Sequence, residues 1–135
     1  MTAPVALSCG EPAGIGPEIA VKAWAALRAD CPFVWIGDPE HLPPGTPVAE
    51  VEHPEDAPGV AAVAFPVLTH PFAAPVRPGL PDPRNAAGVI EVIERAVDLV
   101  REGRASALCT APIHKKALID GAGFAYPGHT EFLAA

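Results

Sequence analysis

The sequence is poor in the residues that mark several protein classes. Only 3 of its 135 residues are cysteines (Cys9, Cys31 and Cys109), and no two of them stand in a CxxC spacing. An odd number of scattered cysteines predicts neither a disulfide framework nor a thiolate zinc site, and it fits a reducing compartment such as the cytoplasm. Positive charge is also scarce, with 9 Lys and Arg against 16 Asp and Glu and a net charge of −7. Such a charge balance offers no positive field to a nucleic acid backbone.

Long apolar runs are missing as well. The chain contains no stretch of about 18 consecutive apolar residues and no basic segment leading into an apolar one at its start, so we expect it neither to span a membrane nor to be exported. Apolar residues make up 50% of the chain and charged residues 19%. This balance is typical of a folded globule, and the length predicts one core. Most of the 18 prolines lie in residues 38–83, which predicts a region rich in loops.

Hydrophobic periodicity divides the rest into short apolar runs and two amphipathic segments. The short runs predict strands at 5–9, 33–36, 48–51, 63–68 and 105–110, the last of them buried. Apolar positions at spacings of three and four predict helices at 17–29 and 85–101. In the first helix, the stripe expected to be buried consists of Ile19, Ala20, Ala23, Trp24 and Leu27. Because strands separated by helices favour right-handed crossovers, we expect an α/β fold with a largely parallel sheet flanked by helices.

A glycine-rich segment, GEPAGIGP at residues 10–17, joins the first predicted strand to the first helix. Its glycines permit a sharp turn and the close approach of a ligand or of another backbone segment. The segment is neither a GxGxxG dinucleotide fingerprint nor a P-loop, since it lacks the P-loop lysine. By spacing alone it is as consistent with a turn that binds nothing as with a binding loop. Glu11 favours binding, because its carboxylate is expected at the C-terminal edge of the sheet, where α/β proteins bind ligands.

Two further motifs carry polar side chains. In TAPIHKK at residues 110–116, Lys115 or Lys116 could pair with a phosphate or carboxylate and His114 could donate a hydrogen bond, although a solvated basic turn stays open. In YPGHTEFL, His129 and Thr130 follow a glycine turn where a new helix is expected to begin, and together they form an oxygen-binding pair. The remaining histidines lie in proline-rich loops without a ligand spacing and are expected at the surface: His41, His53 and His70.

The motifs GEPAGIGPEI, TAPIHKKAL and PGHTEFLA, with NAAG opening the long helix, occur in this order along the whole chain. In this combination the chain resembles the 4-hydroxythreonine-4-phosphate dehydrogenase family of pyridoxine biosynthesis. Members of this family are much longer and have two α/β domains. The resemblance implies that residues 1–135 are a single incomplete α/β region, the N-terminal part of such an enzyme. It also implies an architecture similar to isocitrate and isopropylmalate dehydrogenases instead of a Rossmann fold.

The resemblance implies a chemistry too. NAD or NADP would oxidise 4-phosphohydroxy-L-threonine with the help of a divalent metal (Zn, Mg or Co), and decarboxylation would give 3-amino-2-oxopropyl phosphate. Carried over by motif, His129 and Thr130 would bind the substrate, with Lys115 and His114 as weaker candidates. The resemblance assigns no catalytic or cofactor-binding residue in this chain. The family's metal ligands are three histidines that come later and meet across a homodimer interface, so we expect no metal ligand here and no activity from the isolated chain.

Two alternatives stay open. Similar dehydrogenases act on four-carbon sugar-acid phosphates or on a cis-diol carboxylate, and the motifs do not separate these substrates. The chain could also be a non-catalytic binding module that keeps the fold and the loop of His129 and Thr130.

Overall fold

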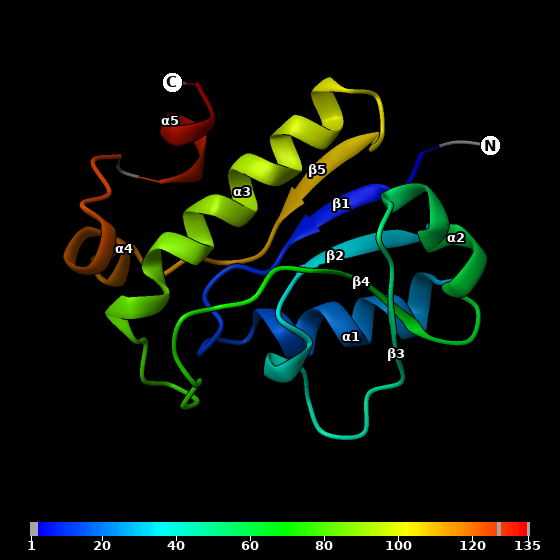
Figure 1. Ribbon diagram of the computed structural model, residues 1–135, viewed down its shortest axis with the longest axis horizontal. Coiled ribbons are helices and arrows are strands. Elements are labelled where there is room, and N and C mark those ends of the chain that lie inside the picture. Colours follow the sequence, from blue (N-terminus) through cyan, green and yellow to red (C-terminus); the bar gives the residue numbers. More distant parts are fainter. Residues whose placement is uncertain (1–2, 127, 135) are drawn as a thin grey trace.

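A five-stranded sheet forms the centre of the molecule in the computed structural model, which describes residues 3–126 and 128–134 (Figure 1). Its strand pairs are all parallel, and the strand order is β3-β4-β2-β1-β5. The strands are β1 (Val5–Ser8), β2 (Phe33–Gly37), β3 (Val48–Glu50), β4 (Phe65–Thr69) and β5 (Ala107–Thr110). The predicted α/β fold with a parallel sheet is confirmed.

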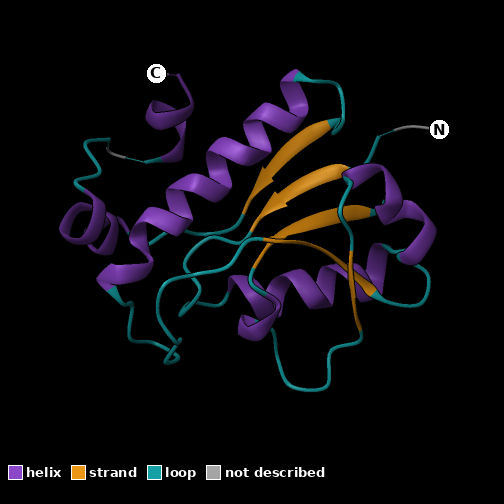
Figure 2. Ribbon diagram, in the orientation of Figure 1, coloured by secondary structure: helices purple, strands orange, loops and turns teal. Residues whose placement is uncertain are grey.

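Helices flank this sheet, with α3 on one side and α1 on the other (Figure 2). The helices are α1 (Gly16–Leu27), α2 (Ala57–Val60), α3 (Ala86–Arg101), α4 (Lys115–Ala122) and α5 (His129–Ala134). Short 3-10 turns lie at η1 (Pro39–His41), η2 (Pro54–Asp56) and η3 (Pro83–Asn85). Proline stands in the first turn of α1, where its missing N–H costs no hydrogen bond. The two long helices agree with the two amphipathic segments of the sequence.

The core is centred on β2, which is buried along its whole length. Phe65 of β4 lies among the aromatic rings of Trp24, Phe33 and Trp35, with ring centroids 5.8 to 6.1 Å away. The Trp24 indole Nε1 also donates a hydrogen bond of 2.7 Å to the Ala61 carbonyl. Trp24 therefore anchors α1 at the side of the sheet that carries β4.

The direction of the connections reverses at β1. The β1–α1–β2 unit steps towards one edge of the sheet, whereas the β4–α3–β5 unit steps back across β1 to the other. Right-handed crossovers in opposite directions place their helices on opposite faces. After β5 the chain enters α4, which packs against α3 and η3, so the segments after β1 and β5 leave the sheet on opposite faces. Such a switch point, at the carboxyl ends of the strands, is where open α/β sheets bind ligands.

Two expectations about burial are wrong. The strand at 105–110 was expected to be buried, but β5 is an edge strand whose Ala107 and Cys109 are exposed, on the face where their partners in β1, Val5 and Leu7, are also only half-buried. In α1, Ile19 is 48% and Leu27 43% exposed, and Ala23 is half-buried. Of the five residues in the predicted stripe, only Ala20 and Trp24 are buried in the core.

Lys115 and Lys116, for which a solvated basic turn was left open, lie in the first turn of α4 with exposed side chains. His114 is the N-cap of this helix, and its Nδ1 accepts a hydrogen bond of 3.1 Å from the Ala117 amide. Gly123, with φ +64°, ends the helix in the left-handed conformation typical of a C-cap glycine. A histidine cap is an uncommon start signal, which is why the helix was not predicted.

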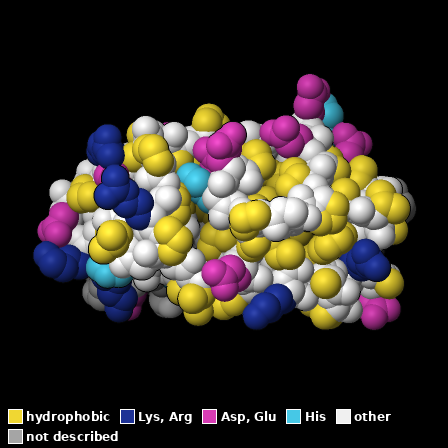
Figure 3. All heavy atoms as spheres, turned by 90° about the horizontal axis from the view of Figure 1, so that it is seen from below, with side chains coloured by type: hydrophobic (Ala, Val, Ile, Leu, Met, Phe, Trp, Pro, Cys, Tyr) yellow, Lys and Arg dark blue, Asp and Glu magenta, His cyan; other side chains and the backbone are white. Residues whose placement is uncertain are grey.

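Of the three histidines expected at the surface, His53 is exposed, whereas His41 and His70 are half-buried. Both of the latter stack edge-on against the Phe72 ring, with centroid distances of 5.2 and 5.9 Å. Figure 3 views the molecule from below, and hydrophobic side chains cover a continuous area across the middle of this face, with most charged groups around its margins. Within the described residues, no helix combines the length and the apolar character needed to cross a bilayer.

Candidate functional site

The glycine loop after β1 packs directly on the segment after β5. The Glu11 amide donates a hydrogen bond of 2.9 Å to the Pro112 carbonyl. Gly10 has φ +67°, and a Cβ placed on it would overlap the Pro112 carbonyl oxygen. A Cβ on Gly16 would lie 2.7 Å from the Cys9 carbonyl oxygen and 3.2 Å from the Ala111 Cβ. The glycines therefore allow two backbone segments to approach closely, and the first two sequence motifs meet at the switch point.

Glu11 lies inside this junction, with 6% of its surface exposed. Its Oε1 accepts a hydrogen bond of 3.2 Å from the Ala13 amide. Burial raises the pKa of Glu11, and the nearby His114 opposes this rise by favouring the ionised form. The sequence placed this carboxylate correctly at the C-terminal edge of the sheet, but the structure buries it in the loop.

Cys9 precedes the loop and is buried, and desolvation raises its pKa to about 12. A thiol with such a pKa is protonated at neutral pH, so Cys9 is not a nucleophile. The Ser8 hydroxyl beside it is buried and has no hydrogen-bond partner among the described residues.

The two lysines of α4 have different surroundings. The Lys116 Nζ pairs with the Asp120 carboxylate one turn later, at 3.0 Å. Lys115 instead lies beside Gly128, where a Cβ would be 3.7 Å from the Lys115 Cε and 3.9 Å from its Nζ. The Glu131 carboxylate also lies beside Gly128, with its Oε2 3.5 Å from the same Cβ position. The second and third sequence motifs therefore meet at Gly128, through Lys115 and not through Lys116.

His129 opens α5 directly after this glycine. Its ring is half-buried, and its Nε2 is enclosed without a hydrogen-bond partner in the part of the chain that the structure describes. Burial lowers the pKa of His129, so the imidazole is neutral at neutral pH and one of its nitrogens has an unused hydrogen-bonding capacity. Thr130, the next residue, is exposed.

An aromatic cluster holds this segment against α3 and α4. The rings of Phe124, Tyr126 and Phe132 lie 5.4 to 5.6 Å apart in tilted and edge-on arrangements. They pack with Val89 of α3 and Leu118 of α4 in a second hydrophobic cluster of the molecule. Since this cluster is separate from the main core, the position of His129 depends on a few aromatic contacts.

The family described as "Pyridoxal phosphate biosynthetic protein PdxA" matches residues 29–135. The chain belongs to this family. A 4-hydroxythreonine-4-phosphate dehydrogenase from a Ruegeria species is 67% identical over 131 residues, which cover 97% of this chain and 40% of that protein. The dehydrogenase of the same name from Roseobacter denitrificans is 62% identical over 134 residues, covering 99% and 41% of the two chains.

Solved structures are similar to this chain as well. The 4-hydroxythreonine-4-phosphate dehydrogenase of Klebsiella pneumoniae matches with a TM-score of 0.84 and 33% identity, over 98% of this chain and 44% of that chain. A terephthalate 1,2-cis-dihydrodioldehydrogenase from Burkholderia xenovorans matches with a TM-score of 0.68 and 25% identity, over 95% and 39%. This PdxA-family chain thus spans about two fifths of the length of the relatives that it matches.

The metal-binding capacity of the described part of this PdxA-family chain depends on how its His, Cys, Asp and Glu side chains are grouped. In residues 3–126 and 128–134, no three His, Cys, Asp or Glu side chains converge in a way that would hold a metal ion. Two of the histidines have other environments: the His114 ring caps α4, and the His129 Nε2 is enclosed by protein. The described residues therefore do not fit a divalent metal by themselves.

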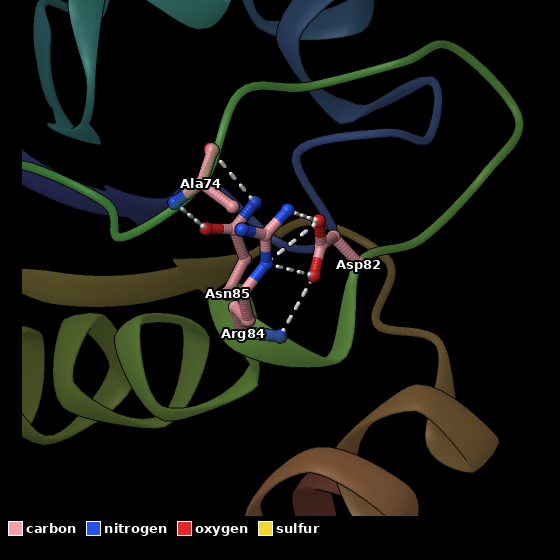
Figure 4. Close-up of polar contacts among 4 residues, drawn as sticks. All are labelled: Ala74, Asp82, Arg84 and Asn85. Atoms are coloured by element: carbon pink, nitrogen blue, oxygen red, sulfur yellow. Dashed lines mark hydrogen bonds and ion pairs between the residues drawn. The ribbon is translucent and has the colours of Figure 1, made fainter.

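Sequence reasoning missed the residues that fix the proline-rich loop before α3. The buried Asn85 amide accepts a hydrogen bond of 2.8 Å from the Ala74 amide and donates one of 3.1 Å to the Ala74 carbonyl (Figure 4). Nearby, Arg84 makes a two-point ion pair with Asp82, whose pKa it lowers. Asp82, Arg84 and Arg77 line a pocket of about 410 Å³ beside it. A polar residue directly before a long amphipathic helix is the signal that could have found Asn85.

Proposed function

We propose that this chain is the N-terminal, substrate-holding part of a two-domain 4-hydroxythreonine-4-phosphate dehydrogenase. The curated relatives carry that name at up to 67% identity across nearly the whole chain. The proposed reaction is the NAD- or NADP-dependent oxidation of 4-phosphohydroxy-L-threonine, followed by decarboxylation to 3-amino-2-oxopropyl phosphate. Its physiological form would be a homodimer.

One observation carries the assignment to this region: the Lys115 ammonium lies beside Gly128, and the next residue, His129, has a buried imidazole nitrogen without a partner. Among the described residues, Lys115 makes no ion pair, and the His129 Nε2 has no partner. Groups that are not satisfied within the fold are available to a ligand, since a buried polar atom without a partner is costly. A phosphorylated hydroxy acid would supply the missing partners.

We assign roles by the chemistry of each side chain. Lys115 would pair with the substrate phosphate as a point charge. The neutral His129 and the Thr130 hydroxyl would hydrogen-bond the oxygens at the reacting end. His114 is a weaker candidate, because its Nδ1 is used as the cap acceptor; the proton then lies on Nε2, which could donate to the phosphate.

The hydride acceptor and the metal would be held mostly outside this region. NAD or NADP would accept the hydride from the secondary alcohol. No metal-ligand set exists in the described residues, so no step is assigned here to a metal, and a divalent ion would be held by histidines in the rest of the enzyme. It follows that the isolated 135 residues would not reduce NAD.

The proposal is tested on a joined protein, in which this chain is followed by the remaining three fifths of the Ruegeria relative. With 4-phosphohydroxythreonine, a divalent metal and NAD or NADP, absorbance should report cofactor reduction by the joined protein and none by the isolated chain. Thr130→Val, at an exposed position, should lower kcat/KM by roughly tenfold without changing Tm, whereas Thr130→Ser should restore activity. Full activity of Thr130→Val would refute the assigned role.

A four-carbon sugar-acid phosphate remains the second candidate substrate, and a cis-diol carboxylate is supported by the structural match to a dihydrodiol dehydrogenase. The values of kcat/KM for the three substrates rank them directly. Lys115→Met should lower kcat/KM for the two phosphorylated substrates and leave that for the diol unchanged. A joined protein that prefers the sugar-acid phosphate or the diol by more than about tenfold would contradict the proposed substrate.

A further inference from the structure

The candidate site contains a negative side chain as well as a positive one. The Glu131 Oε2 lies 3.5 Å and the Lys115 Nζ 3.9 Å from one point, the position of a Cβ on Gly128. The two atoms are therefore no further apart than the sum of these distances, yet neither side chain forms an ion pair among the described residues. Opposite charges that are close but unpaired can bind a ligand that carries both signs of charge.

The first turn of α5 directs Glu131 towards this point. The Phe132 amide donates a hydrogen bond of 3.2 Å to the Gly128 carbonyl and so closes the turn. Residues three apart on such a turn lie on the same side of it, which brings the Glu131 side chain back to Gly128. The Phe132 ring is held by the rings of Phe124 and Tyr126, each at a centroid distance of 5.4 Å. Glu131 itself is exposed, so its carboxylate is accessible to a ligand.

A second carboxylate in this part of the molecule has a different environment. Asp120 of α4 pairs with Lys116 at 3.0 Å, so its charge is already compensated within the fold. Glu131 has no such partner in the part of the chain that the structure describes. Its charge is therefore available to a cationic group of a ligand, whereas that of Asp120 is not.

The candidate substrates differ in the group that would face Glu131. The proposed substrate, 4-phosphohydroxy-L-threonine, carries an ammonium and a phosphate on one short carbon chain. The sugar-acid phosphate has a hydroxyl in place of the ammonium, and the cis-diol carboxylate has neither an ammonium nor a phosphate. A carboxylate binds an ammonium more strongly than a hydroxyl, because that hydrogen bond is charge-assisted.

We propose that Glu131 is a specificity-determining residue, whose carboxylate binds the α-ammonium of the substrate while Lys115 binds its phosphate. This role rests on the proposed function, from which it takes the phosphate contact of Lys115. Glu131 favours the amino acid phosphate over its hydroxy analogue in two ways, by attracting the ammonium and by repelling a ligand that is purely anionic. His129 and Thr130 keep their contacts to the oxygens at the reacting end.

The joined protein provides the test, with Glu131→Gln as the variant and Asp120→Asn as its matched control. Glutamine keeps the size and an acceptor oxygen of the side chain and removes its charge. Glu131→Gln should lower kcat/KM for 4-phosphohydroxythreonine by roughly tenfold, and leave that for the sugar-acid phosphate unchanged or raised. Asp120→Asn should change the ratio of the two kcat/KM values by less than about twofold. Neither substitution should change Tm.

Titration calorimetry with the same two compounds, in the absence of cofactor, gives Kd values that do not depend on turnover. A joined protein that reduces no cofactor, but binds the amino acid phosphate more weakly after Glu131→Gln alone, would refute the proposed function and support the role of Glu131. An active joined protein in which Glu131→Gln leaves the ratio unchanged, or in which Asp120→Asn alters it equally, would overturn the role of Glu131 and leave the proposed function intact.

Discussion

The two faces of the sheet are built to different degrees of completion. The α3 face is closed by seven buried residues of that helix: Ala86, Gly88, Val89, Val92, Ile93, Ala96 and Leu99. The α1 face buries only four residues of its helix and leaves an uncharged groove beside them. The α3 helix is therefore packed on the sheet along its length, whereas α1 leaves apolar side chains exposed beside the groove.

The largest expected effect on stability comes from replacing an isoleucine on the α3 face, compared with an isoleucine on the α1 face. Ile93→Ala, at a position 1% exposed, should lower the free energy of unfolding of the isolated chain by about 2 to 5 kcal/mol, because it leaves a cavity under α3. Ile19→Ala, on the groove, should cost less than about 1 kcal/mol. Urea titration measures both, and equal losses would show that the α1 face is as tightly packed as the other.

A second comparison concerns the loop at the switch point. Gly10→Ala should cost about 3 kcal/mol, since the new Cβ would be strained at φ +67° and would also overlap the Pro112 carbonyl. Gly103→Ala, at φ +76° but in open space, isolates the backbone strain and should cost about 1 kcal/mol. Thermal unfolding of the two variants checks this, and similar losses would mean that the close approach is unimportant.

A third comparison concerns the loop before α3, which is held by Asn85 and by the ion pair of Asp82 with Arg84. Asn85→Ala should cost about 2 kcal/mol, because both polar groups of Ala74 would lose their partner. Asp82→Ala removes an exposed ion pair with Arg84 and the hydrogen bond that the Asp82 carboxylate accepts from the Arg84 amide, and it should cost about 1 kcal/mol. If chemical denaturation ranked the two variants in reverse order, the loop would be held by the ion pair instead.

The smallest effect should depend on pH. The folded state raises the pKa of Glu11, so the stability associated with its protonated form is fully present below the unfolded-state pKa and is lost as pH rises through the folded-state pKa. Glu11→Gln mimics the protonated form. Its Tm should exceed that of the unchanged chain at about pH 7 and match it at about pH 4. A variant that is less stable at about pH 7 would show that the ionised carboxylate is stabilising.

Local patterns predicted the parts of this fold that depend on local physics. The helices α1 and α3 were found because their apolar spacing is itself helical, and the short strands were bounded by turn residues. The exposure of Ile19, Leu27 and Cys109 could not be predicted in this way, since it depends on which layers surround a strand. Periodicity shows that a face is apolar but not whether anything covers it.

The sequence named the residues of the candidate site but did not predict the contacts between them. Glu11 and the glycine loop were placed at the correct edge because strand ends converge there. The choice of Lys115 over Lys116 requires α4, in which Asp120 pairs with Lys116 one turn later. The approach of Lys115 to Gly128 and the enclosure of His129 are tertiary contacts between the start of α4 and the start of α5, and no spacing in the sequence encodes them.

The central claim, that the corner at Gly128 binds the phosphorylated substrate, is tested most directly by a pair of lysine variants in the joined protein. Lys115→Met should raise KM for 4-phosphohydroxythreonine by roughly 10- to 100-fold, since a charge-assisted contact to phosphate contributes about 1.5 to 3 kcal/mol. Lys116→Met, which breaks an exposed pair, should change KM by less than about twofold. Equal KM values for the two variants, or a larger effect at Lys116, would contradict the account.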